Sequence, residues 1–210
     1  MSPVDSTIIY DILPWDQPRR IFLSGSEGSG KSSILQHIAT GSPYKVATQY
    51  TFESLCPEWL ELSNLTISVL DAHLIHSVMY ARAQNFVRAN ADGVVFVLGD
   101  KDDDVVWEDG LHFLSVFVLQ VKETEDTPLL VLVNQADQDG ARTLDEIDAQ
   151  IRELLVKKGR VNQCYTIMTF NAKTGVGLER ALTWLSDRLR EDAIPAIVDK
   201  GAAHIQLAPY

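Results

Sequence analysis

The sequence predicts an α/β fold in which helices cover both faces of a mostly parallel sheet. Short apolar segments bounded by turn residues alternate along the chain with segments of helical pattern, which is typical of strands joined by crossover helices. The apolar segments are hydrophobic on both faces, as strands buried between two helical layers must be. The chain has 210 residues, of which 46% are hydrophobic, so we expect one domain with one core. The expected boundaries are an N-terminal arm at residues 1–18, the folded domain at 19–193 and a C-terminal tail at 194–210.

Strands are predicted at short segments that are rich in leucine, β-branched and aromatic residues. In chain order they are Arg20–Ser24, Leu65–Leu70, Val94–Leu98, Leu129–Val133 and Tyr165–Phe170. A further strand, at the edge of the sheet, is expected within Thr51–Leu62.

Helices are predicted in the segments between these strands. In chain order they are Lys31–Ala39, Ser77–Asn90, Val105–Val121, Leu144–Lys157 and Leu178–Arg190. The fourth has the clearest pattern, because five apolar residues fall on one helical face: Leu144, Ile147, Ile151, Leu154 and Leu155. Thr143 and Glu146 have the spacing of a capping box, which predicts where this helix begins.

The net charge argues against several classes of partner. Eighteen lysine and arginine residues stand against 29 aspartate and glutamate residues, which gives a formal charge of −11. Binding to nucleic acid or to anionic lipid through bulk charge is therefore not expected. The two cysteines, Cys56 and Cys164, are far apart, and the first twenty residues lack the basic and apolar regions of a signal peptide. With no apolar run of about 18 residues to span a membrane, we expect a cytoplasmic protein, or one held at a membrane surface by a partner.

A phosphate-binding motif follows the first predicted strand. Residues 25–32 read GSEGSGKS, which matches G-x-x-x-x-G-K-[ST] in the strand-to-helix setting that the motif needs. Backbone N–H groups of such a loop wrap a phosphate, the lysine reaches the outer phosphates, and the serine hydroxyl can bind Mg²⁺. The alternative is a glycine-rich turn that binds nothing. The residues predicted to contact the nucleotide here are Gly25, Glu27, Gly28, Ser29, Gly30, Lys31, Ser32 and Ser33.

An aspartate ends the second long strand. Asp71 follows Leu65–Leu70 and therefore lies at the carboxyl end of the sheet, where ligands of open α/β folds bind. Together with Ser32, it is a predicted ligand of Mg²⁺. The alternative is a turn or helix N-cap aspartate.

Two further motifs follow later strands and carry a family resemblance. Residues 134–137 read NQAD, and residues 171–173 read NAK. The chain resembles the Ras-like small GTPases over nearly the whole stretch 19–190. The resemblance rests on four motifs in the same order: a phosphate loop, a strand-terminal aspartate, N-x-x-D and x-A-K. Within these GTPases the chain is most similar to the Arf and Arf-like branch, which has an acidic residue at the position of Glu27 and a segment similar to residues 134–141. Gly177-Leu178 and Trp184-Leu185 also fit this branch.

The resemblance implies a guanine nucleotide, GTP or GDP, bound with Mg²⁺. Asp137 would accept the two donors on the Watson–Crick edge of guanine, which adenine lacks, and a site built for such donors rejects the analogue without them by roughly 10⁴-fold. Asn134 would bond the base and its neighbouring loop. In the family pattern the N–H of Ala172 bonds the guanine oxygen and Lys173 packs against the base. The chain departs from the pattern at Gln135, where the family has lysine, and at Asn171, where many members have serine.

The catalytic motif of the family is missing. Small GTPases follow the strand-terminal aspartate with x-x-G-Q, in which the glycine senses the γ-phosphate and the glutamine orients the attacking water. Here Leu74 and Ile75 occupy these two positions, so we expect slow or absent GTP hydrolysis. His76, one position later, is a candidate for the missing catalytic group, and a partly exposed histidine at a helix start is the alternative. A threonine that completes the Mg²⁺ shell is expected at Thr48 or Thr51.

The leading hypothesis is therefore an atypical Arf-like domain that acts, bound to GTP, as an interaction subunit of an intracellular complex. The alternatives are an active switch completed by His76 or by an arginine of a partner, a scaffold that binds no nucleotide, and a P-loop kinase using ATP. Ser2 removes the acceptor for myristoylation, and the C-terminus has no prenylation cysteine. The apolar segment at residues 7–15 is expected to pack on its own domain or on a protein partner. Trp59 and Trp107 are candidates either for partner contact or for the edge of the core.

Overall fold

The computed structural model describes residues 18–39, 47–48, 58–62, 65–71, 91–99, 104–134 and 142–191. Its strands are β1 (Arg19–Gly25), β2 (Ala47–Thr48), β3 (Glu58–Leu62), β4 (Leu65–Asp71), β5 (Gly93–Gly99), β6 (Leu129–Asn134) and β7 (Tyr165–Phe170). Its helices are α2 (Lys31–Ala39), α4 (Asp104–Phe113), α5 (Leu144–Lys157) and α6 (Leu178–Glu191), with a π-helical segment at Leu114–Val118 and a 3₁₀ turn at Lys122–Thr124.

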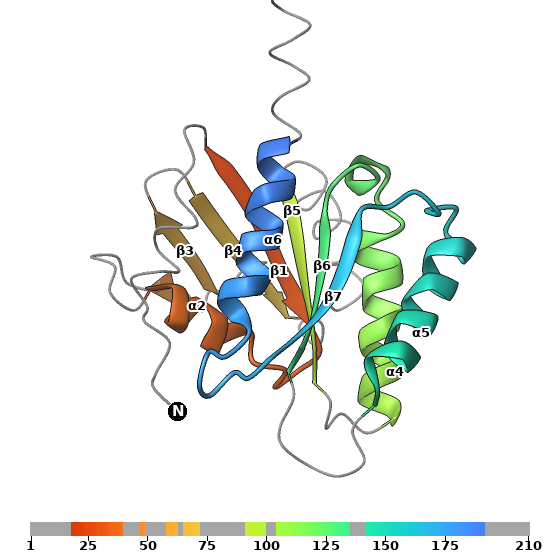
Figure 1. Cartoon of the computed structure of the whole chain (residues 1–210), viewed down its shortest axis with the longest axis horizontal. Coiled ribbons are helices and arrows are strands. Elements are labelled where there is room, and N and C mark those ends of the chain that lie inside the picture. The colour runs from red at the N-terminus through yellow and green to blue at the C-terminus, as the bar shows by residue number, and fades with distance from the viewer. Residues whose placement is uncertain are drawn as a thin grey trace, which may run out of the picture.

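The described strands form one sheet in the order β2-β3-β4-β1-β5-β6-β7. The strands β4, β1, β5, β6 and β7 run parallel, whereas β3 and β2 are antiparallel additions at one edge. Helices lie over this sheet, with α6 in front of it in Figure 1. The predicted α/β class is confirmed, and so is each predicted strand, although β3, which was expected at the edge of the sheet, has β2 outside it. Because β1 has β4 on one side and β5 on the other, the carboxyl end of β1 is the switch point at which open α/β sheets bind ligands.

Alternate residues of the central strands enter two separate cores. Val95 and Val97 of β5 belong to the core under α2 and α6, whereas Phe96 and Leu98 belong to the core under α4 and α5. Every residue of β5 is buried, which explains why the sequence of this strand is apolar without alternation. The two helical layers hold β1 and β5 rigidly, and these strands position the loops at their carboxyl ends.

The long helix predicted at Val105–Val121 is regular only as far as Phe113. The next five residues are all buried and form a π-helical segment, in which Leu119 donates its N–H to the carbonyl oxygen of Leu114 at 3.0 Å. Because five consecutive residues go fully around a helix, this segment is covered by protein on all sides. The predicted helix at Ser77–Asn90 lies outside the described residues, as do residues 1–17 and 192–210.

The predicted start of α5 is confirmed. Thr143 accepts the N–H of Glu146 at 3.3 Å, and the Glu146 carboxylate accepts the N–H of Thr143 at 2.8 Å. The buried face of this helix is narrower than predicted, because Leu144 is 38% exposed. None of the described helices has the length and apolar composition of a membrane span.

Trp107 belongs to the core rather than to an exposed contact surface. It is 3% exposed, and its indole N–H donates to the Gln150 carboxamide at 2.8 Å. The Arg142 guanidinium lies 4.3 Å from the centre of the indole ring and pairs with Asp104 at 2.7 Å. Of the two alternatives for this tryptophan, the structure favours the core. The Trp59 side chain is outside the described part of the chain.

Candidate functional site

The phosphate loop begins directly against a neighbouring strand. Gly25 has a φ of 149°, and a Cβ at this position would lie 1.9 Å from the carbonyl oxygen of Val97. The next residue, Ser26, donates its N–H to that same oxygen at 3.1 Å. Only glycine fits at the first position of the motif, because the loop leaves β1 in contact with the backbone of β5.

The phosphate loop also touches the loop predicted to hold the base. Gly30 has a φ of 105°, and a Cβ there would lie 2.8 Å from the Ala172 Cβ and 3.2 Å from Nδ2 of Asn134. Three segments far apart in the sequence therefore meet at one glycine. By contrast, Gly28, with a φ of 68°, has no atom within 4 Å of its Cβ position and borders open space.

A buried lysine holds a positive charge under the phosphate loop. Lys31 is 5% exposed, and its Nζ donates to the carbonyl oxygens of Gly25 at 3.2 Å and Ser26 at 2.6 Å. The N-terminus of α2 begins at the same residue and adds a partial positive charge. The Oγ of Ser29, which is 1% exposed, has no hydrogen-bond partner within the described chain. Together these groups form a site suited to an anionic ligand.

The predicted base loop is a closed turn joined to β6. Asn134, the last residue of β6, accepts the N–H of Ala172 at 3.0 Å through its Oδ1. The carboxamide oxygen of Asn171 accepts the N–H groups of Lys173 at 3.0 Å and Thr174 at 3.1 Å. The asparagine at position 171, where many relatives of the resembled family have serine, thus shapes the turn itself. The Lys173 side chain is exposed at this turn.

The predicted Mg²⁺ ligands are brought together only in part. Asp71 pairs in register with Gly25, so its backbone lies beside the start of the phosphate loop. Ser32 is exposed in the first turn of α2. Serine hydroxyl and aspartate carboxylate oxygens are the kinds of ligand that Mg²⁺ prefers, so these two residues fit a Mg²⁺ ion.

Thr48 lies on the far side of β3 and β4 from the phosphate loop. It belongs to the edge strand β2, where it pairs with Glu58. At about 4.8 Å between neighbouring strands, its backbone is roughly 14 Å from β1. The structure thus does not bring Thr48 to the phosphate loop. Thr51, His76 and Asp137 lie outside the described residues.

One residue at this site was not found from the sequence. His37, in the last turn of α2, has its Nε2 2.9 Å from the carbonyl oxygen of Ala172. It carries no motif, and its partner is 135 positions away along the chain. Sequence spacing therefore gave no signal for this contact.

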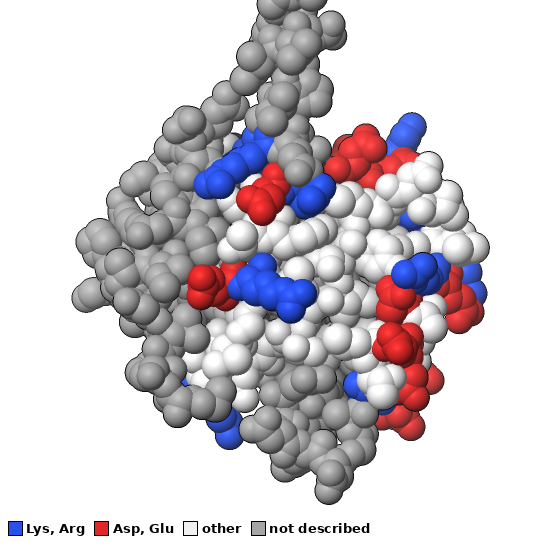
Figure 2. All heavy atoms as spheres, viewed as in Figure 1, with Lys and Arg blue, Asp and Glu red and all other residues white. Residues whose placement is uncertain are grey.

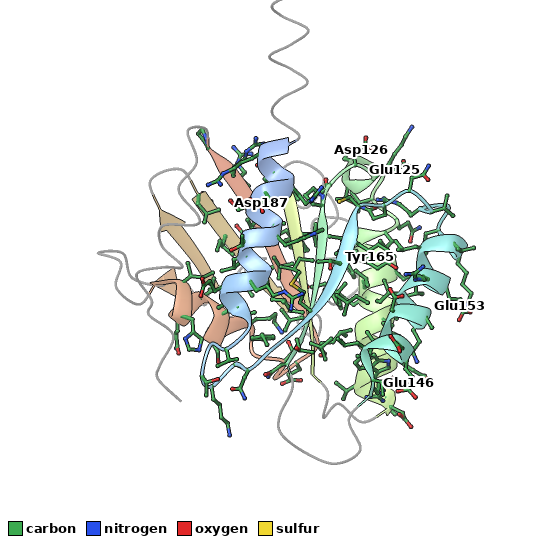
Figure 3. All side chains as sticks on the ribbon, in the orientation of Figure 1. Glu125, Asp126, Glu146, Glu153, Tyr165 and Asp187 are labelled. Carbon is green, nitrogen blue, oxygen red and sulfur yellow. The ribbon has the colours of Figure 1, made fainter. Side chains whose placement is uncertain are left out.

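The pKa shifts found on the α5 side mark structural interactions. Burial, together with a 2.8 Å hydrogen bond to Asp148, raises the pKa of Tyr165 to about 12. The Thr143 N–H holds the pKa of Glu146 below its usual value. Figure 3 shows Tyr165 on β7 and Glu146 on α5, and Figure 2 shows acidic side chains gathered along the edge that α5 forms. These groups lie on α5 and β7, neither of which carries the phosphate loop.

A second set of charged groups lies at the amino end of the parallel strands, opposite the end that carries the phosphate loop. The Arg160 side chain is 5% exposed and donates to the Thr124 hydroxyl at 3.3 Å and to the Gln163 carboxamide at 2.9 Å. Burial lowers the pKa of Arg160, while the nearby carboxylates of Glu125 and Asp126, labelled in Figure 3, oppose this shift. This cluster ties the loop before β6 to the loop before β7.

Comparisons with known proteins agree with the fold and with the family that the sequence resembles. A family model, described as the ADP-ribosylation factor family, matches residues 6–189. The chain is 29% identical over 197 residues to ADP-ribosylation factor-like protein 1 of Saccharomyces cerevisiae, covering 92% of this chain and all of the relative. It is 28% identical over 172 residues to the protein of the same name from Drosophila melanogaster, covering 81% of this chain and 89% of the relative.

The fold is also similar to that of a solved structure. This is the crystal structure of an ADP-ribosylation factor-like GTP-binding protein, the small COPII coat GTPase Sar1 of Encephalitozoon cuniculi, in complex with GDP. The TM-score is 0.66 at 18% identity, and the match covers 91% of this chain and 87% of the other.

Proposed function

The chain belongs to the ADP-ribosylation factor family as an Arf-like small GTPase, and from this premise we propose that it binds GTP and hydrolyses it slowly or not at all. In the GTP-bound state it would act as an interaction subunit of an intracellular complex. The observation that carries this proposal is a contrast within one site. The phosphate-loop motif and the turn at residues 171–174 support nucleotide binding, whereas Leu74 and Ile75 replace the glycine and glutamine that serve hydrolysis.

Binding of the phosphates is supported by the geometry of the first loop. Gly28 is exposed and has no atom within 4 Å of its Cβ position, so the loop is open to a ligand there, and Lys31 supplies the positive charge. The remaining contacts would come from residues of the same loop, which are Gly25, Glu27, Ser29, Gly30, Ser32 and Ser33. When bound, Mg²⁺ would neutralise charge on the phosphates, and Ser32 and Asp71 would hold it.

Binding of guanine is supported by the second loop. Asn134 joins β6 to the turn at residues 171–174, so the N–H groups of this turn keep a fixed orientation. Asn171, Ala172 and Lys173 would line the base, and Asp137 would select guanine over adenine.

Slow hydrolysis follows from the residues that replace x-x-G-Q. In the family motif the backbone of the glycine comes close to the γ-phosphate and senses it, and Leu74 does not replace this glycine in that role. The side chain of Ile75 has no polar group that could orient the attacking water. An intact Ras-type site without an activating partner turns over at only about 10⁻⁴ s⁻¹. Without the glutamine, we expect turnover below that rate.

The test restores the missing motif. We expect the double variant Leu74→Gly, Ile75→Gln to hydrolyse GTP at least about ten times faster than the natural chain, because it regains the water-orienting amide. The matched control, His76→Ala, should leave the slow basal rate unchanged. Measurable hydrolysis by the natural chain that His76→Ala abolishes would overturn the proposal in favour of an active switch.

A further inference from the structure

His37 joins the helix of the phosphate loop to the loop that holds the base. Its Nε2 lies 2.9 Å from the carbonyl oxygen of Ala172. A carbonyl oxygen can only accept a hydrogen bond, so Nε2 carries the proton and donates it. The half-buried imidazole is therefore fixed in one orientation against the base loop.

The same imidazole packs against a second point of that loop. Gly175 has a φ of 74°, and a Cβ at this position would lie 3.1 Å from Nδ1 and 3.2 Å from Cε1 of His37. Gly175 also closes the loop, since its N–H donates to the carbonyl oxygen of Asn171 at 2.8 Å. The ring thus contacts both the beginning and the end of the turn at residues 171–175.

Ala172 is held from two sides. Its N–H donates to Asn134 of β6 at 3.0 Å, while its carbonyl oxygen accepts from His37 of α2. The flanking peptide groups are thereby oriented by two different elements. One of these elements, α2, begins with Lys31 and Ser32 at the phosphate loop and carries His37, in its last turn, at the base loop.

We propose that His37 is a positioning residue for guanine binding, which couples the base loop to the phosphate loop through α2. This inference rests on the proposed function, because it requires the base to lie at residues 171–173. The imidazole does not touch the nucleotide in this account. It holds Ala172 and Gly175 so that the turn at residues 171–175 keeps its position beside the phosphate loop.

The experiment compares a guanine nucleotide, which would contact both the phosphate loop and the base loop, with a phosphate ligand that would contact only the phosphate loop. Full-length protein would be loaded with a fluorescent GDP analogue and Mg²⁺, and its dissociation rate measured for the natural chain, His37→Leu and His37→Gln. The affinity for inorganic tripolyphosphate, which has no base, would be measured by calorimetry on the same proteins. Gln36→Leu, on the exposed side of the same helix, is the matched control.

We expect His37→Leu to release the GDP analogue about 5–10 times faster, the effect of losing one hydrogen bond. His37→Gln should restore the slow rate, because its amide N–H₂ can donate to the same carbonyl oxygen. Affinity for tripolyphosphate should be equal in all variants, and Gln36→Leu should match the natural chain.

Two results would overturn the inference. One is an unchanged GDP dissociation rate in His37→Leu, and the other is an equal loss of GDP and tripolyphosphate binding, which would make His37 a general structural residue. Failure of the proposed function would look different, since the natural chain would then not retain the GDP analogue at all. That result would overturn both proposals.

Discussion

Replacing Gly30 with alanine tests the contact between the phosphate loop and the base loop. The new Cβ would lie 2.8 Å from the Cβ of Ala172, which is too close and cannot rotate away. The φ of 105° also disfavours any side chain. The backbone strain costs about 1–2 kcal/mol and the overpacking about 1–3 kcal/mol, so we expect the free energy of unfolding to fall by roughly 2–5 kcal/mol.

Gly28→Ala is the matched control for this prediction. Gly28 also has a positive φ, 68°, but its Cβ position has no atom within 4 Å. We expect this variant to lose only the strain, about 1–2 kcal/mol. Urea unfolding of the nucleotide-free proteins, followed by circular dichroism, should therefore give Gly30→Ala the lower midpoint, by about 0.3–1.5 M for a slope of about 2–3 kcal/mol/M. Equal midpoints for the two variants would refute the close contact at Gly30.

Three further predictions concern other parts of the structure. Asn134→Ala should release GDP about 10–100 times faster, because the base loop loses its hydrogen bond to β6. Stopped-flow fluorescence measures this dissociation rate, and an unchanged rate would contradict the proposed role of Asn134 in the base site. Thr143→Ala should lower the free energy of unfolding by about 1 kcal/mol in urea titrations, since the capping box with Glu146 is lost. Because the pKa of Tyr165 is raised from 10.0 to about 12 in the folded state, the stability it contributes is full below pH 10 and lost as pH rises through about 12. Tyr165→Phe should remove this part of the alkaline unfolding curve, and identical curves would show that the hydrogen bond to Asp148 contributes nothing.

The sheet could be predicted because its strands are buried on both faces. A segment such as β5, with every residue buried, has a continuous apolar pattern that few other elements share. The phosphate loop was equally clear, since Gly25 and Gly30 occupy positions where a Cβ would collide with neighbouring atoms. In both cases the pattern stands in one short stretch of sequence, even though the collisions at the two glycines involve residues far away along the chain.

Features that depend on tertiary packing could not be predicted in the same way. The π-helical turn at Leu114–Val118 lies in a segment that is buried on all sides, and a helical period in the sequence does not reveal it. Trp107 is flanked by acidic residues in the sequence, yet Arg142 and Gln150 enclose it in space. The contact of His37 with the base loop joins positions that share no motif.

Two of the predicted Mg²⁺ ligands, Ser32 and Asp71, have positions that the sequence motifs and strand pairing define. Ser32 follows the phosphate loop, and Asp71 is held in register with Gly25 by strand pairing. The choice between Thr48 and Thr51 could not be made from spacing, because it depends on how the chain crosses from α2 to the edge of the sheet. In the structure Thr48 lies at that edge.

The most direct test of the central claim is the fate of bound GTP. Gently purified protein would be supplied with GTP and Mg²⁺, and the nucleotide released by denaturation would be separated by ion-exchange chromatography over several hours. Lys31→Ala, which loses the buried charge of the phosphate loop, is the control and should retain no nucleotide. The account predicts bound GTP that persists without conversion to GDP; conversion to GDP, or a natural chain that retains no nucleotide, would contradict it.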